Sequence, residues 1–126
     1  MTRGETRVAK LEARIGGTGL SDVFRLTDWQ LAHLAGVSES ASDEELEWDI
    51  APFRALNRAP MGMTGHLVFT AWDPDHPATQ SPFVIEKIIR KRIGFDGLLL
   101  TDDLDMEALS GSVPERAVRA LAAGCD

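Results

Sequence analysis

The chain of 126 residues is 44% hydrophobic and 26% charged, a balance typical of one folded domain and not of a disordered or collagen-like chain. Its 13 Lys and Arg against 20 Asp and Glu give a net charge of −7, which disfavours nonspecific attraction to nucleic acid or anionic lipid. No apolar run is long enough to cross a membrane, and the first residues lack the apolar core of an export signal. We therefore expect a cytoplasmic protein without a membrane or nucleic-acid partner. Its single cysteine, Cys125, excludes an intrachain disulfide.

The first third of the chain carries few structural signals. Residues 1–40 show neither a helical nor a strand period, and Gly16-Gly17-Thr18-Gly19 interrupts them. This part is therefore predicted to be loop-like or poorly ordered, and residues 41–126 are expected to form the structured part.

A helix is predicted from Ser42, because Ser42 and Glu45 have the spacing of a capping box. Leu46 and Ile50 then fall on one helical face. Pro52 lacks an amide proton and should kink or shorten the helix.

The next predicted element is a buried strand at 61–64. The apolar segment 67–69 is predicted to be its exit, separated from it by Gly65-His66, and a loop follows at 73–77. Ser81-Pro82 predicts a second helix that ends at Gly94. The cations at positions 90–92 lie in its last turn, where we expect them to be solvated and stabilised by the helix dipole.

The apolar run 97–101 is typical of a strand buried on both faces of a parallel sheet. A third helix is predicted to start at Ser112-Val113-Pro114-Glu115 and to run to Gly124. The two strands begin about 35 residues apart, the size of a right-handed βαβ unit. The expected fold class is therefore α/β with parallel strands.

Polar residues follow both predicted strands, and in parallel α/β folds the active site lies at the strands' carboxyl ends. Asp102 and Asp103 come directly after an apolar strand, where an unpaired carboxylate is costly to bury. Spacing alone leaves open whether they do chemistry or whether one caps the next turn and the other faces water. It likewise leaves open whether His66, after the first strand, bonds to backbone or has a functional role.

Several segments, in this order and spacing, resemble glycoside hydrolase family 3 and within it the bacterial β-N-acetylhexosaminidases of cell-wall recycling. They are Met63-Thr64-Gly65-His66, residues 73–82 from Asp73-Pro74-Asp75-His76-Pro77 to Ser81-Pro82, and Gly94-Phe95-Asp96-Gly97 leading to Thr101-Asp102-Asp103-Leu104-Asp105-Met106. The resemblance covers roughly residues 42–126.

The resemblance implies a (β/α)8 barrel, of which residues 41–126 would form roughly strands 6 and 7 with their flanking helices. It implies removal of terminal β-linked N-acetylglucosamine from muropeptides, with retention of configuration and without a cofactor or metal. The family's nucleophile falls on Asp102, with Asp103 as an orienting or capping neighbour. His66 matches a histidine that could line the sugar pocket, and Gly65 replaces the more usual alanine.

Two motifs typical of these enzymes are missing: a Lys-His-x-Pro-Gly-His-Gly segment and an Asp-Ser-His dyad whose histidine serves as general acid/base. His33 lies near the dyad's place, but Leu31 occupies the position of the aspartate, so we do not expect His33 to act as acid/base. We therefore expect a fragment, as a frameshift or truncation would produce, that is marginally stable and inactive alone.

Two other functions are weighed beside the glycosidase. In a metal-dependent hydrolase, Asp102, Asp103 and Asp105 would bind Mg²⁺ with His66 or His76 nearby. In a noncatalytic half-barrel module, the exposed strands would bind a sugar or another half-barrel. The oligomeric state is left open.

Three further residues receive mainly structural interpretations. Trp72 could stack on a sugar ring, but packing is the more ordinary role of such a residue. His76 is expected to be a solvated loop residue, and Cys125 a small buried residue and not a nucleophile.

Overall fold

The computed structural model describes residues 40–126, so the predictions for residues 1–39, including that for His33, lie outside the described part. The elements in chain order are the helix α3 (Asp43–Ala55), the strand β1 (Met61–Thr64), the 3₁₀ turn η2 (Ala78–Gln80), the π-helix η3 (Val84–Ile93), the strand β2 (Leu98–Thr101) and the helix α4 (Val113–Ala123). This order confirms the α/β prediction for the described residues.

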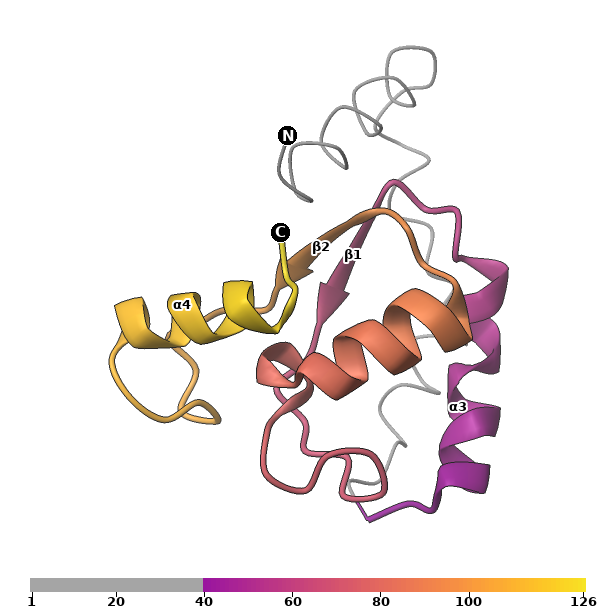
Figure 1. Ribbon diagram of the computed structural model, residues 1–126, viewed down its shortest axis with the longest axis horizontal. Coiled ribbons are helices and arrows are strands. Elements are labelled where there is room, and N and C mark those ends of the chain that lie inside the picture. The colour runs from indigo at the N-terminus through magenta and orange to yellow at the C-terminus, as the bar shows by residue number, and fades with distance from the viewer. Residues whose placement is uncertain (1–39) are drawn as a thin grey trace.

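The two strands form a parallel pair in which Met61 lies opposite Leu98 and Thr64 opposite Thr101. The helix η3 connects them and lies between α3 and α4 (Figure 1). One core cluster joins η3 to β2 and α4 through Ile85, Leu99 and Ala120. A second cluster joins η3 to α3. The connecting helix is therefore the element on which the rest of the described chain packs.

The helix α3 begins as predicted. The Ser42 hydroxyl accepts the Glu45 N–H at 3.3 Å, and the Glu45 carboxylate accepts the Ser42 N–H at 2.8 Å. These hydrogen bonds to the ionised form lower the pKa of Glu45. Pro52 lies inside the helix, which continues to Ala55.

The first strand ends at Thr64 as predicted, and segment 67–69 lies in its exit. The carbonyls after β1 bond to η2: Gly65 O accepts the Thr79 N–H at 3.2 Å, and Leu67 O accepts the Ala78 N–H at 2.8 Å. Three apolar residues in a row give no information on which backbone partner they meet.

The prediction that the second strand is buried on both faces is wrong. Leu99 is 2% exposed, whereas Leu100 is 42% exposed, and Met63, opposite Leu100, is exposed as well. Successive side chains of a strand point to opposite faces, and in the described part helices cover only one of them. The other face of the strand pair is apolar and open.

The second helix begins and ends as predicted. The Ser81 hydroxyl accepts the Val84 N–H at 3.1 Å, and Gly94 ends the helix with a φ of 80°, which glycine adopts without strain. Its turns are wider than the α-helical turns that the apolar spacing predicted.

Arg90 corrects the prediction of three solvated cations. Its side chain is 7% exposed and bonds to the Asp126 carboxylate, itself 2% exposed, at 3.0 Å. It also donates to the carbonyl of Gly97 at 2.8 Å and to that of Phe95 at 3.2 Å. Arg90 therefore fixes the segment that enters β2, a long-range role that a basic triplet does not reveal.

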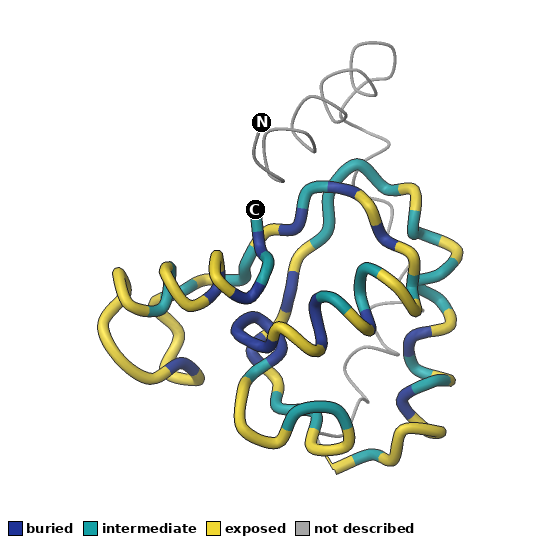
Figure 2. The backbone as a smooth tube through the Cα atoms, viewed as in Figure 1, coloured by how far each residue is buried: buried dark blue, intermediate teal, exposed yellow. Residues whose placement is uncertain are grey.

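The helix α4 starts at its predicted capping box, in which the Glu115 carboxylate accepts the N–H of Ser112 at 2.8 Å. Its buried residues are Ala120 and Ala123, whereas the larger Val118 and Leu121 are exposed. Figure 2 shows most of α4 as exposed, whereas the longest run of buried residues covers η2 and Ser81. Among the described helices, none has the length and apolarity to cross a membrane.

Candidate functional site

The candidate site lies at the carboxyl end of the strand pair, where two loops leave β1 and β2 side by side. Thr64 and Thr101 end the strands opposite each other, and the Asp102 N–H donates to the Thr64 carbonyl at 3.2 Å. This bond extends the ladder by one step beyond the strands. The parallel register therefore places Asp102 beside the segment that carries His66.

Asp102 is half-buried, and its carboxylate is held at one oxygen. Oδ1 accepts the N–H of Asp103 at 2.8 Å. Within residues 40–126, no other hydrogen-bond donor reaches the Asp102 side chain. A carboxylate that is oriented by one hydrogen bond and otherwise uncommitted is chemically able to act as a nucleophile.

Asp103 and Asp105 have a different task. Asp103 Oδ1 accepts the Asp105 N–H at 2.9 Å, an Asx turn, and both residues are exposed. Asp103 therefore caps the turn after Asp102, as the resemblance implied for this neighbour.

His66 is 8% exposed and bonded at both ring nitrogens. Nδ1 lies 2.8 Å from Thr79 Oγ1, and Nε2 lies 2.8 Å from the carbonyl oxygen of Asp103. The structure thus joins the two predicted site segments through this ring. Both ring nitrogens already contact protein atoms, so this arrangement does not favour a direct hydrogen bond from His66 to a sugar. That contact stays a prediction.

Sequence reasoning missed two groups that support the site. Thr79 is fully buried, and its hydroxyl lies 2.8 Å from the Thr64 hydroxyl and 2.8 Å from the Gly65 carbonyl. Arg116, on α4, donates to the carbonyls of Leu104 at 2.7 Å and Met106 at 3.1 Å. Neither residue stands in a sequence pattern that indicates its partner, because each partner lies at least ten positions away.

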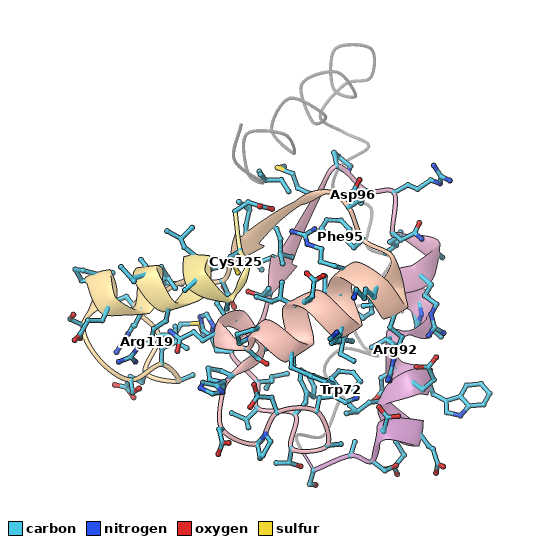
Figure 3. The ribbon with its side chains drawn as sticks, in the orientation of Figure 1. Trp72, Arg92, Phe95, Asp96, Arg119 and Cys125 are labelled. Atoms are coloured by element: carbon cyan, nitrogen blue, oxygen red, sulfur yellow. The ribbon has the colours of Figure 1, made fainter. Side chains whose placement is uncertain are left out.

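Trp72 contacts residues of the helices α3 and η3 and not the strand ends. Its indole N–H donates to Asp43, the Arg92 guanidinium lies 5.9 Å from its ring centroid, and Figure 3 shows these two labelled side chains near one another. Hydrogen bonds from Arg92 and Trp72 lower the pKa of Asp43. These contacts support the packing interpretation of Trp72 over sugar stacking.

His76 is exposed, as expected, and contacts Asp73 in its own loop at 3.1 Å. Burial raises the pKa of Asp73, but hydrogen bonds from Ser81, His76 and the Asp75 N–H outweigh burial and leave that pKa lowered. This carboxylate organises the loop that leads to η2 and η3.

Cys125 is buried, as expected, and burial raises the pKa of its thiol, which disfavours the reactive thiolate. No three His, Cys, Asp or Glu side chains within residues 40–126 converge as a metal-binding group, so the geometry gives the metal-dependent hypothesis no ligand set. A shallow depression on α4 around Pro114 and Arg119 carries none of the candidate residues.

Comparison with known families finds a match between residues 30–126 and the Glycosyl hydrolase family 3 N terminal domain. The match begins at residue 30, ahead of the boundary near residue 41 that the motifs indicated, and takes in His33.

Two curated relatives carry the name beta-hexosaminidase. The protein from Tolumonas auensis is 42% identical over 103 residues, which are 75% of this chain and 30% of the relative. The protein from Neisseria gonorrhoeae is 39% identical over 100 residues, 75% of this chain and 27% of the relative. The chain therefore spans less than a third of either relative.

Solved structures of similar proteins agree with these matches. NagZ from Neisseria gonorrhoeae superposes with a TM-score of 0.59 at 37% identity, covering 68% of this chain and 24% of NagZ. The β-N-acetylhexosaminidase from Beutenbergia cavernae superposes with a TM-score of 0.58 at 33% identity, covering 62% of this chain and 24% of that enzyme.

Proposed function

Because the chain belongs to glycosyl hydrolase family 3, we propose that it carries the nucleophile-bearing part of a retaining β-N-acetylhexosaminidase site. In this proposal β1 and β2 are strands 6 and 7 of a (β/α)8 barrel. The substrate is a muropeptide with a terminal β-linked N-acetylglucosamine, cleaved in the cytoplasm without a cofactor. Support comes from the relatives named beta-hexosaminidase and from the site geometry.

The observation that carries the proposal is the Asp102 carboxylate, half-buried at the end of β2 and oriented by the Asp103 N–H at 2.8 Å. In a retaining mechanism a carboxylate attacks the anomeric carbon through an oxocarbenium-like transition state, and the leaving oxygen takes a proton from an acid group. Water then cleaves the glycosyl-enzyme ester and restores the carboxylate. Asp102 takes the nucleophile's part.

The proposal includes negligible turnover by the isolated chain. A complete barrel takes about 250 residues, and this chain spans 30% of the Tolumonas auensis relative. The acid/base group is expected on a loop outside residues 40–126. Turnover of a chromogenic N-acetylglucosaminide by the 126-residue chain, lost in Asp102→Ala, would contradict this part.

The nucleophile is tested in a chimera in which residues 41–126 replace the matching segment of the Neisseria gonorrhoeae relative. We expect Asp102→Asn to lower kcat by at least about a thousandfold, because the amide cannot form the glycosyl ester. Asp105→Asn is the matched control, since this exposed carboxylate lies in the same loop. Equal losses in the two variants, or no loss in Asp102→Asn, would overturn the assignment.

One observation favours a second candidate, a noncatalytic assembly module. The strand face of Met63 and Leu100 is apolar and exposed, as are Val118 and Leu121 on α4. Exposed apolar surface of this kind marks association surfaces. In this alternative the face packs against another half-barrel, and a monodisperse monomer in size-exclusion chromatography without N-acetylglucosamine binding would exclude it.

A further inference from the structure

His66 is a buried histidine that links three backbone segments. It follows β1, contacts Thr79 of η2 through Nδ1 and contacts Asp103 after β2 through Nε2, each at 2.8 Å. A buried polar ring is costly unless its nitrogens are bonded, and here both of them are. The residue is therefore held in one orientation by groups on either side of it.

Proton counting fixes the role of one ring nitrogen. The Asp103 carbonyl can only accept, so Nε2 must carry a hydrogen and donate it. The Thr79 hydroxyl lies 2.8 Å from Nδ1, donates to the Gly65 carbonyl at 2.8 Å and lies 2.8 Å from the Thr64 hydroxyl. Thr79 therefore holds the other edge of the ring within a buried polar cluster.

The bond to Asp103 reaches the proposed nucleophile in one further step. Asp103 uses its carbonyl for His66 and its N–H for the Asp102 carboxylate at 2.8 Å. Its side chain also accepts the Asp105 N–H at 2.9 Å. The His66 bond to the Asp103 carbonyl therefore restricts the backbone of Asp103. The N–H of the same residue orients the Asp102 carboxylate.

We propose that His66 is a positioning residue that acts through Asp103: by donating its Nε2–H to the Asp103 carbonyl it clamps the loop after β2 and holds the Asp102 carboxylate in a fixed orientation. The catalytic consequence rests on the function proposed above. The hydrogen-bond relay, which runs from His66 through Asp103 to the Asp102 carboxylate, does not rest on that function, since it exists whether or not Asp102 is a nucleophile.

The tautomer is tested first, on the unmodified 126-residue chain labelled with ¹⁵N. Long-range ¹H–¹⁵N spectra distinguish a protonated from an unprotonated ring nitrogen. We expect Nε2 of His66 to carry a hydrogen, because its partner, the Asp103 carbonyl, can only accept. An Nε2 without a hydrogen, or one that carries it only part of the time, would overturn the proposal without any variant.

The relay is tested by amide hydrogen exchange in three variants. His66→Phe keeps a ring of similar size but loses both hydrogen bonds, His66→Gln keeps a donor and an acceptor, and His76→Gln alters an exposed histidine away from the strand ends. In His66→Phe we expect the amides of Asp103 and Asp105 to exchange about tenfold faster, the factor expected for one lost buried hydrogen bond. His66→Gln should restore most of the protection, and His76→Gln should change nothing.

A purely structural role would give another pattern. The Leu99 amide, bonded to Asp126 at 3.0 Å, reports on the strand itself. Equal acceleration at Leu99 and Asp103, or failure of His66→Gln to protect Asp103, would show that the ring only fills space. The two proposals can fail separately. If the exchange pattern is as expected but Asp102→Asn leaves the chimera active, the proposed function is wrong and the positioning role of His66 is still supported.

Discussion

The two ends of the strand pair differ in how much room they leave. At the end where β1 and β2 begin, a Cβ on Gly97 would lie 2.5 Å from the Ala59 carbonyl and 2.7 Å from the Pro60 carbonyl. At the end where they finish, a Cβ on Gly65 would meet no atom within 4 Å. Two glycines near the same pair of strands thus occupy opposite surroundings.

The charged groups at the two ends differ in the same way. Arg90 and Asp126 pair with side chains 7% and 2% exposed and pin the entry to β2. Asp102 is only half-buried, and Asp103 and Asp105 are exposed. The closed end therefore stabilises the fold, whereas the end where the strands finish leaves room beside Gly65 and carries exposed carboxylates.

The largest effect is expected from breaking the buried pair at the closed end. Arg90→Met leaves the buried Asp126 carboxylate without the Arg90 cation and removes the donors to Phe95 and Gly97. We expect the free energy of unfolding to fall by about 3–5 kcal/mol, measured by urea unfolding followed by circular dichroism.

A matched control is Lys91→Met, an exposed position on the same helix, which should change the free energy of unfolding by less than about 0.5 kcal/mol. Adding Asp126→Asn to Arg90→Met should recover part of the loss, because no unpaired charge remains. A loss below about 1 kcal/mol in Arg90→Met would mean that the closed end does not depend on this pair.

A smaller effect is expected from filling the space at each end. Gly97→Ala forces a methyl group against two backbone carbonyls and should cost about 1–3 kcal/mol. Gly65→Ala has room and no positive φ, so it should be neutral or stabilising by up to about 1 kcal/mol. Similar values for both variants, in parallel urea titrations, would remove the contrast between the ends.

The smallest effect concerns the loop that leaves the open end. The folded-state pKa of Asp73 lies below its ordinary value of 3.8, so the stability it contributes is present above about pH 4 and is lost as the pH falls through the folded-state pKa. Asp73→Asn should cost about 1 kcal/mol at pH 7 and progressively less toward pH 3.

Urea unfolding at pH 7, 5 and 3 checks this dependence, with Asp75→Asn as the exposed control in the same loop. If Asp73→Asn costs the same at every pH, the carboxylate's charge is not what holds the loop.

Local signals predicted the element boundaries well. The capping boxes at Ser42 and Ser112, the Ser81 start and the Gly94 end all depend on residues within a few positions of each other, so the sequence contains both partners of each contact. The burial of the second strand was predicted wrongly for the opposite reason, because it depends on which distant elements cover each face. The backbone partner of Leu67 likewise lies more than ten positions away.

In the candidate site too, the sequence predicted the residues but not their contacts. Asp102 and His66 stood out because of where they follow apolar strands, and their family resemblance gave them roles. Their contacts, however, run through Asp103, Thr79 and the Thr64 hydroxyl. Sequence spacing placed the polar residues at one edge of the sheet, but it could not distinguish a ring open to a ligand from one bonded on both sides.

By itself the sequence determined the order of helices and strands, the parallel pairing and the family, because these follow from local periodicity, capping and motif order. Only the tertiary structure decided which charges are buried, which strand face is covered and which nitrogen of His66 meets which partner. Those properties depend on atoms brought together from distant parts of the chain, and Arg90 with Asp126 shows the difference most clearly: one is a cation in a basic run, the other a carboxylate 36 positions later, and they meet only in the folded protein.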